Sequence, residues 1–175
     1  LAQNLWAGLM SPLRTPGLAL ITGASSGIGA SYAKRLAQRG FDLLLTARTS
    51  TRLHVLAAQL RTAHGVNVEV LPADLTLAAD IARLAQRLND DPAISLLVNN
   101  AGMAVIGPLV GAEPSRLDSM IQLNVTALTQ LAVAAASAFA ARGHGVLINI
   151  AAALALAPEQ YHGAYSATKA YVLAL

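Results

Sequence analysis

Short apolar runs alternate with longer segments of helical periodicity along most of the chain. The apolar runs predict strands at 18–22, 42–46, 66–71, 95–98 and 146–150. The segments between and after them predict helices at 28–39, 50–64, 77–89, 115–141 and 163–175. Most of the strand segments are apolar at successive positions, which is typical of parallel strands covered on both faces. The alternation therefore predicts βαβ units.

Glycines and polar residues indicate where several of these helices begin and end. Gly40, Gly65 and Gly143 follow the last periodic residues, where a left-handed backbone closes a helix. Ser115 and Asp118 are spaced as an N-cap and N3 pair for the helix at 115–141. With right-handed crossovers, the five strands predict an α/β fold with a doubly wound, Rossmann-type parallel sheet of order 3-2-1-4-5.

Composition supports a folded domain and narrows its functions. Of 175 residues, 55% are hydrophobic and 12% charged, which excludes a disordered chain. The absence of cysteine excludes disulfides and thiolate metal ligands, so we expect no metal site and a cytoplasmic location. The net charge is +3, and the basic residues are scattered without aromatic partners, which argues against nucleic-acid binding.

Two segments bear on domain organisation and on the membrane. Residues 1–17 are too short and too broken in apolar pattern for a signal peptide or an anchor. We interpret them as an N-terminal leader or extension before a single domain at 18–175. The stretch between Asp118 and Arg142 has no charge, but polar residues interrupt it, so a helix buried in protein is favoured over a membrane span.

A cluster of glycines lies between the first predicted strand and the first predicted helix. Small residues there let the backbone approach a pyrophosphate, and the helix N-terminus supplies amide donors and a positive dipole. The strand, turn and helix together predict a dinucleotide site. The residues expected to bind the cofactor in this turn are Gly23, Ser25, Ser26, Gly27, Ile28 and Gly29.

The glycine spacing is Gly-x-x-x-Gly-x-Gly rather than the common Gly-x-Gly-x-x-Gly. With Asn99-Asn100-Ala101-Gly102 and Tyr165-x-x-x-Lys169, it resembles the short-chain dehydrogenase/reductase family from about Leu18 to the C-terminus. The resemblance implies an oxidoreductase that interconverts a carbonyl and a hydroxyl group of a small molecule by hydride transfer. It also implies that Asn99 ties neighbouring strands together, while Asn100, Ala101 and Gly102 line the cofactor ribose.

Arg48 follows the second predicted strand, where this resemblance places the 2′ position of the adenosine ribose. NAD-binding relatives have an acidic residue just before this site, where Ala47 stands here. An arginine suits a phosphate and no carboxylate repels it, so NADP(H) is the predicted cofactor. A surface arginine at a strand end is the alternative. Asp74 resembles the family aspartate that bonds the adenine amino group, although a turn or capping role would also explain it.

Tyr165 and Lys169 are four residues apart and so share one helix face. A nearby ammonium lowers the tyrosine pKa from its ordinary value near ~10 and favours acid–base chemistry. The resemblance implies that Tyr165 is the general acid/base and that Lys169 assists it and also holds the nicotinamide ribose. It implies that Asn124, a mediocre helix former in mid-helix, anchors a water relay to the lysine. A buried asparagine bonded to backbone is the alternative for Asn124.

Two departures from the family pattern concern catalysis. The family serine thirteen residues before the tyrosine is Ala152 here, and losing one such donor costs about 10²–10³ in turnover. Either another group supplies the hydrogen bond, or this is an inactivated variant, or the natural protein has little reductase activity. The chain also ends about three turns into the tyrosine helix. We therefore expect a truncated sequence without the family's last strands, with the fifth strand as an edge.

Several alternatives stay open. A non-enzymatic NADP(H)-binding scaffold or sensor would be compatible with Ala152. The turn also satisfies Gly-x-Ser-x-Gly, the nucleophile elbow of hydrolases, with Ser25, Asp118 and either His144 or His162 as a triad. That elbow normally follows several strands, which weighs against it. Because relatives assemble through the helix at 115–141, we expect a homodimer or homotetramer, the alternative being a helix buried in one subunit.

Overall fold

The computed structural model describes residues 16–175, so the predicted extension at 1–17 lies almost wholly outside the described residues. Five parallel strands form one sheet in the order β3-β2-β1-β4-β5, which confirms the predicted doubly wound topology. The strands are β1 (Leu18–Thr22), β2 (Asp42–Thr46), β3 (Val68–Val70), β4 (Ile94–Asn99) and β5 (Val146–Asn149). The helices are α2 (Gly27–Gln38), α3 (Ser50–His64), α4 (Ala78–Asp90), α5 (Pro114–Ile121), α6 (Leu128–Arg142) and α7 (Gly163–Ala174).

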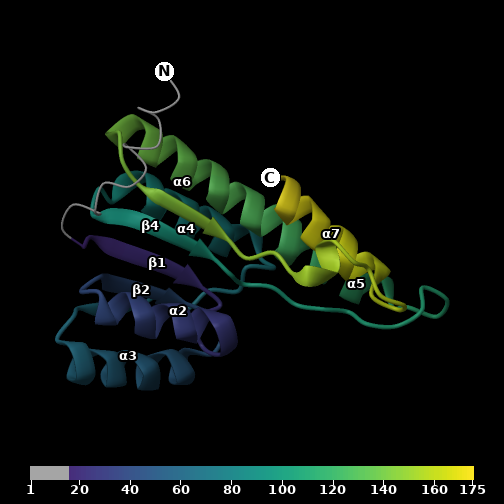
Figure 1. Cartoon of the computed structure of the whole chain (residues 1–175), viewed down its shortest axis with the longest axis horizontal. Coiled ribbons are helices and arrows are strands. Elements are labelled where there is room, and N and C mark those ends of the chain that lie inside the picture. Colours follow the sequence, from purple (N-terminus) through teal and green to yellow (C-terminus); the bar gives the residue numbers. More distant parts are fainter. Residues whose placement is uncertain (1–15) are drawn as a thin grey trace.

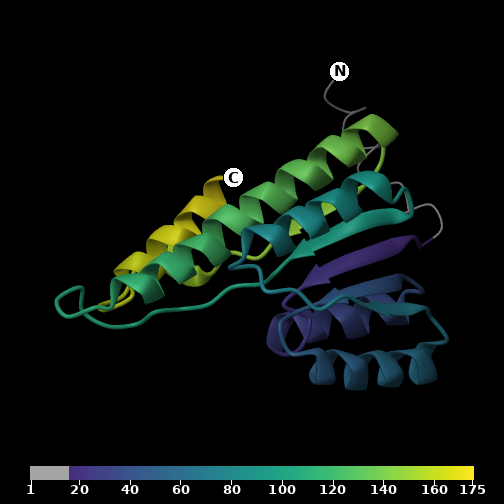
Figure 2. The ribbon, with the colours of Figure 1, turned by 180° about the vertical axis from the view of Figure 1, so that it is seen from behind.

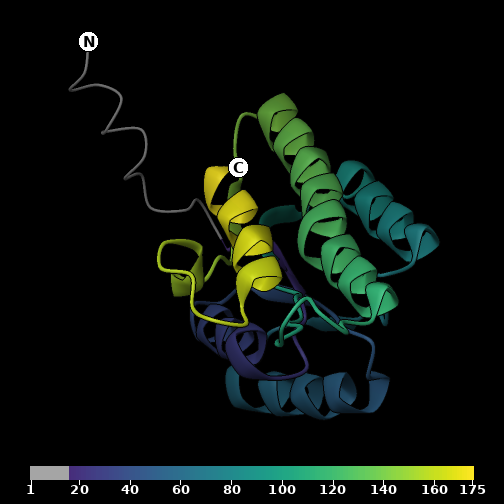
Figure 3. The same cartoon turned by 90° about the vertical axis from the view of Figure 1, so that its right-hand side faces the viewer.

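Helices cover both faces of the sheet (Figure 1). On one face, α2 and α3 pack against the strands, with Leu36 and Leu53 in the same apolar cluster as Leu43. On the other face, α4 and α6 lie side by side, as Figure 2 shows, with Ile81 and Leu131 in a second cluster. Figure 3 places the two helix pairs on opposite sides of the fold. The sheet therefore buries both of its faces, as its continuous apolar strands predict.

The segment predicted as one helix at 115–141 has a different start and an irregular middle. Its N-cap is Glu113 and Pro114 occupies the first turn, so the predicted cap at Ser115 and Asp118 is wrong. The Ser115 hydroxyl donates instead to Glu113 Oε1 at 2.7 Å. Proline is suited to this position because its fixed φ matches the helix and its missing N–H has no helical partner there. Between α5 and α6 the backbone forms a π-helical segment, Gln122–Ala127.

Within residues 16–175, one helical stretch, Pro114–Arg142, is long and apolar enough by length and composition to cross a membrane. Half of its most apolar window is buried inside the fold. Leu131 and Ala135 of α6 belong to the apolar cluster that includes Leu84 and Leu88 of α4. The stretch is thus packed as a core helix of an α/β domain.

The parallel arrangement brings the carboxyl ends of all strands to one edge of the sheet. The glycine turn, the loop at 100–113 and the loop at 150–162 all follow strands at this edge (Figure 1). β1 and β4 are neighbours there, and the chain leaves them for opposite faces of the sheet. Ligands of doubly wound folds bind in the crevice at such a switch point.

Candidate active site

The glycine turn joins the end of β1 to the start of α2. A Cβ on Gly29 would lie 2.5 Å from the carbonyl oxygen of Gly23 and 2.6 Å from Asn100 Nδ2, so a larger residue does not fit. Gly23 and Gly27 have left-handed backbones, with φ of 66° and 57°, and the space around the Cβ position of Gly27 is open. The turn is thus packed on one side and open on the other, which gives a phosphate access to backbone amides.

Two polar residues hold this turn against β4. Thr22 Oγ1 accepts the backbone N–H groups of Asn100 and Ala101, both at 2.9 Å. Asn100 Nδ2 donates to the Thr22 carbonyl at 2.9 Å, so Asn100 ties β1 to β4. The resemblance gave this role to Asn99, but Asn99 Nδ2 donates to the Leu128 carbonyl at 2.8 Å and ties β4 to α6. The sequence reasoning missed Thr22, whose signal is a hydroxyl at the end of an apolar strand directly before the glycines.

A cleft of about 540 Å³ follows the carboxyl edge from the glycine turn to β3. Gly29 is buried beneath the turn. Arg48 is an exposed residue beyond the end of β2 and also lines the cleft. The other residues predicted to bind the cofactor at this end all line it, namely Gly23, Ser25, Ser26, Gly27, Ile28, Asp74, Asn100, Ala101 and Gly102.

Asp74 lines the cleft and also stabilises a turn. Its Oδ1 accepts the backbone N–H of Thr76 at 3.0 Å and the Thr76 hydroxyl at 2.8 Å. Burial acts to raise the pKa of Asp74, but these hydrogen bonds and the positive charge of Arg48 outweigh it, so the pKa lies below its ordinary value. Asp74 is therefore a carboxylate at neutral pH. The turn role left open by the sequence is present, and adenine recognition stays a prediction.

Tyr165 and Lys169 of α7 line a smaller cavity of about 190 Å³, together with Asn100 and Gly102. Lys169 is only 4% exposed, and its Nζ donates to the Ile150 carbonyl at 2.8 Å. Burial lowers the pKa of this ammonium. Two of the three residues predicted to be catalytic, Tyr165 and Lys169, thus line one cavity, which shares Asn100 and Gly102 with the cleft at the glycine turn, whereas the third, Asn124, does not line it. Their chemical roles stay predictions.

The run of alanines after β5 follows the wall of this cavity. Ala151 lines the cavity, whereas the half-buried Ala152 does not. Ala152 precedes a short 3₁₀ turn, Ala153–Ala155, whose side chains offer no hydrogen-bond donor. The two protein side chains that can donate a hydrogen bond into the cavity besides Asn100 are therefore Tyr165 and Lys169.

Asn124 is fully buried in the π-helical segment. Its Nδ2 donates to the Met103 carbonyl at 2.8 Å and to Thr168 Oγ1 at 3.0 Å, while its Oδ1 accepts the Met103 N–H at 2.9 Å. These are the backbone contacts of the alternative interpretation. Asn124 and Lys169 still lie close, because a Cβ on Gly102 would be 3.1 Å from Asn124 Oδ1 and 3.5 Å from Lys169 Nζ. The water relay stays a prediction.

Thr168 extends this network into α7 and was missed by sequence reasoning. Its hydroxyl, in a residue 5% exposed, accepts from Asn124 and donates to the Tyr165 carbonyl at 2.7 Å. The network therefore runs from Met103 through Asn124 and Thr168 to the backbone of Tyr165. Threonine just before Lys169 carries no signal by itself, because only the fold brings it to Asn124.

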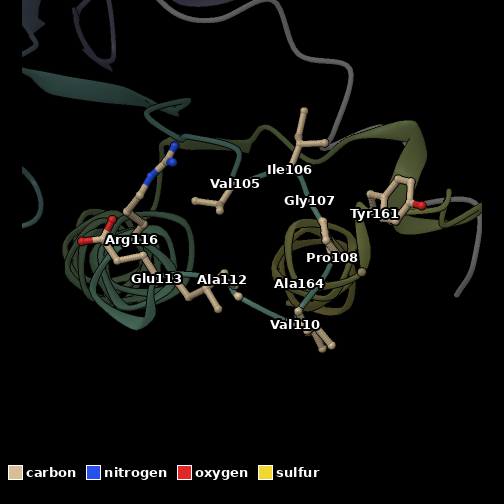
Figure 4. A pocket seen from close by; sticks show the side chains of 14 residues that line it. Val105, Ile106, Gly107, Pro108, Val110, Ala112, Glu113, Arg116, Tyr161 and Ala164 are labelled. Carbon is tan, nitrogen blue, oxygen red and sulfur yellow. The ribbon is translucent and has the colours of Figure 1, made fainter.

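A third cavity, of about 590 Å³, lies between the N-terminal ends of α5 and α7 (Figure 4). The loop that follows β4 crosses it, and Gly107 N donates to the Tyr161 carbonyl at 2.9 Å, which joins this loop to the one before α7. Most of its lining is apolar, including Val105 and Val110, and its charged side chains are Glu113 and Arg116. Ala104 lines the cavity of Tyr165 and Lys169, and Val105 lines this one, so the two cavities are neighbours along the loop.

The hydrolase alternative does not agree with this arrangement. Ser25 lies at the carboxyl edge of the sheet, whereas His144 directly precedes β5 and lies at the opposite edge. His162 Nδ1 is 3.0 Å from the Gln160 carbonyl, and no hydrogen bond within residues 16–175 joins it to Ser25 or Asp118. The triad that the motif requires is therefore not assembled.

Comparison with known proteins agrees with the fold. The family model described as short chain dehydrogenase matches residues 17–175. A curated relative, human 17-beta-hydroxysteroid dehydrogenase type 3, is 33% identical over 98% of this chain. The match covers 56% of that relative, so the chain spans little more than half of its length.

Solved structures are similar over almost the whole described chain. The bulky-bulky ketone specific alcohol dehydrogenase from Comamonas testosteroni has a TM-score of 0.89 at 46% identity, over 91% of this chain and 64% of that one. A short-chain dehydrogenase from Sphingobium yanoikuyae in complex with NADPH has a TM-score of 0.87 at 51% identity, over 90% and 61%. The chain belongs to the short-chain dehydrogenase family.

Proposed function

We propose that this protein is an NADP(H)-dependent oxidoreductase that interconverts a carbonyl and a hydroxyl group of a small molecule by hydride transfer. The observation that carries the proposal is that Tyr165 and Lys169 line a cavity with Asn100 and Gly102, which also line the cleft of the glycine turn. This neighbourhood supports Tyr165 and Lys169 as an acid–base pair next to the cofactor. Membership of the short-chain dehydrogenase family supports the same function.

The residues of the cleft fit such a cofactor. The open space beside Gly27, at the start of α2, suits a pyrophosphate, and Asp74 offers an acceptor to the adenine amino group. Asn100 to Gly102 and Lys169 would hold the nicotinamide ribose. When bound, the nicotinamide would supply or take up the hydride. Tyr165 would donate a proton to the substrate oxygen or remove one from it, and Lys169 lines the same cavity.

Arg48 supports NADP(H) as the cofactor. It lines the adenine end of the cleft, and the preceding residue there is Ala47 rather than a carboxylate. The Sphingobium relative was solved with NADPH, which agrees with this choice for a similar chain. Fluorescence titration of Arg48→Ala with NADPH and NADH tests it. We expect NADPH to bind at least about tenfold more weakly and NADH almost unchanged, and equal affinities before and after the change would contradict it.

The alternative is a cofactor-binding scaffold or sensor, and Ala152 favours it. Both functions require cofactor binding, so only turnover of a substrate distinguishes them. NADPH oxidation with a broad panel of carbonyl compounds, by the wild type and by Ala152→Ser, separates them. We expect slow turnover that rises up to about 10²-fold with the restored hydroxyl. No turnover by either protein would favour the scaffold.

The oligomeric state and the cellular location of the protein stay predictions. The exposed Ile121 of α5 and Val133 of α6, 46% and 59% accessible, support a homodimer or homotetramer that forms through this helical stretch. Light scattering after gel filtration measures the assembly, and an aspartate at Val133 should shift it towards monomer. Family membership supports a small-molecule substrate and a cytoplasmic protein, and fractionation of producing cells tests the location.

A further inference from the structure

Positive charge is concentrated in the first half of the fold. Residues 18–67 carry a single acidic residue, Asp42, and six basic ones, Lys34, Arg35, Arg39, Arg48, Arg52 and Arg61. The rest of the chain carries six basic and eight acidic residues, so the excess charge of the protein comes from β1, α2, β2 and α3. Asp42 bonds Asn67 with both carboxylate oxygens at the amino ends of the strands, away from the cleft. The carboxyl edge of this half is thus free of its one acidic group.

A fourth cavity, of about 480 Å³, lies between α2 and α3 and opens next to the cofactor cleft. Ser25 and Arg52 line both this cavity and the cleft, so they mark the passage between the two. Thr51, next to Arg52 in the chain, also lines this cavity, as does Lys34 in the middle of α2. A ligand group at the passage therefore meets two hydroxyls and a guanidinium.

Neither arginine near the passage is neutralised by an ion pair. The ion pairs found within residues 16–175 use Arg83 and Arg87, and none uses Arg48 or Arg52. The first turns of α2 and α3 contain no acidic residue. The one carboxylate that lines the cleft, Asp74, interacts with Arg48. Arg52 is the second arginine that lines the cleft, and it takes part in none of the ion pairs found within residues 16–175.

We infer that Arg52 is a second specificity-determining residue, which binds the 2′-phosphate of the cofactor opposite Arg48 at the passage marked by Ser25. The inference rests on the proposed NADP(H) dependence and extends it. Arg48 lies two residues before α3 and Arg52 in its first turn, so one phosphate monoester at the start of α3 can meet both guanidinium groups. The amide dipoles at the start of α3 add to this attraction. NADH, with a hydroxyl at this position, gains nothing from Arg52.

The test uses ligands that differ only in that phosphate. Adenosine 2′,5′-bisphosphate and adenosine 5′-monophosphate are titrated calorimetrically against the wild type, Arg52→Gln, Arg48→Gln and Arg39→Gln. Arg39 is an exposed arginine at the far end of α2 and serves as the matched control for loss of one charge. Circular dichroism of each variant confirms that it is folded.

We expect Arg52→Gln to lower the affinity for adenosine 2′,5′-bisphosphate about tenfold and to change the affinity for adenosine 5′-monophosphate by less than twofold. Arg39→Gln should leave the affinity for both ligands unchanged. If Arg52→Gln leaves the bisphosphate within twofold while Arg48→Gln weakens it, the inference is wrong and the NADP(H) proposal stands. A similar loss for both ligands would also overturn it, because Arg52 would then not read the phosphate. If the wild type binds both ligands equally, the NADP(H) preference itself fails.

Discussion

The two ends of the cleft are built differently. At the phosphate end, β1 and β2 are buried from their second residue onward, and Gly29 leaves no space for a side chain. At the substrate end, all four residues of β5 are only partly buried, and the neighbouring loops expose Leu109, Val110 and Leu156 at 73%, 91% and 78%. The phosphate end is rigidly packed, whereas the substrate end presents apolar side chains on loops.

The difference reflects what each end has to recognise. A phosphate is bound by backbone amides and cations, so the main chain must be fixed by close packing and by glycines. A substrate is selected by side chains on loops, which tolerate change because few buried contacts depend on them. Tyr165 and Lys169, which are predicted to be catalytic, lie on α7, and the backbone of Tyr165 is joined to the packed part through Thr168 and Asn124. Four changes separate the two ends experimentally.

Tyr165→Phe should give the largest effect and should act on chemistry alone. General acid–base catalysis contributes about 10²–10⁴-fold, and phenylalanine keeps the ring without the hydroxyl. We expect kcat for NADPH-dependent carbonyl reduction to fall by that factor, with NADPH affinity by fluorescence within twofold. Turnover that survives this substitution would show that the proton comes from elsewhere.

Gly29→Ala should act on the phosphate end. The new Cβ would meet the Gly23 carbonyl, so the turn must shift; we expect NADPH to bind more than about tenfold more weakly and the free energy of unfolding to fall by about 1–3 kcal/mol. Gly65→Ala is the control for a substitution without close packing, because the Cβ position of Gly65 lies in open space at the end of α3, although its φ of 68° adds a backbone strain that Gly29 does not have. It should destabilise by about 1–2 kcal/mol and leave NADPH affinity unchanged; equal losses of affinity in both variants would refute the packing argument.

Thr168→Val tests the link between the two ends. Valine keeps the shape but removes the hydroxyl that joins Asn124 to the Tyr165 carbonyl. We expect kcat to fall roughly tenfold through displacement of Tyr165, with NADPH affinity nearly unchanged, and Thr168→Ser to restore most of kcat. If valine and serine give the same kcat, the hydroxyl does not position Tyr165.

Lys169 gives the smallest effect, a pH dependence of stability. Burial lowers its pKa in the folded protein below the ordinary 10.5, so the unfolded chain binds more protons between the two values. The free energy of unfolding of the cofactor-free wild type should therefore rise, relative to Lys169→Met, as the pH increases from 7 towards 10.5. Urea denaturation at a series of pH values measures it, and a constant difference between the two proteins would contradict a charged, buried lysine.

Much of the fold and the phosphate end could be predicted from the sequence. Local patterns predict the strand order, the end of α3 at Gly65, and the turn from Gly23 to Gly29. They do so because hydrophobic period, the backbone freedom of glycine and the order of elements along the chain act over short distances. The cap at Ser115 was predicted wrongly because Glu113 and Pro114 also suit a helix start, and the pattern alone did not rank them.

Which polar side chains form hydrogen bonds with one another depends on the tertiary structure. Thr22 bonds residues 78 and 79 positions away, and Asn124 reaches Thr168 across 44 positions. Such pairs depend on crossover connections and on the π-helical segment, which no local pattern specifies. Asn100, rather than Asn99, joins β1 to β4. The two side chains have different partners because successive residues at the end of a strand point to opposite faces of the sheet. Local patterns in the sequence thus predicted the elements and the position of the cleft, whereas the network around Tyr165 depends on how the elements pack.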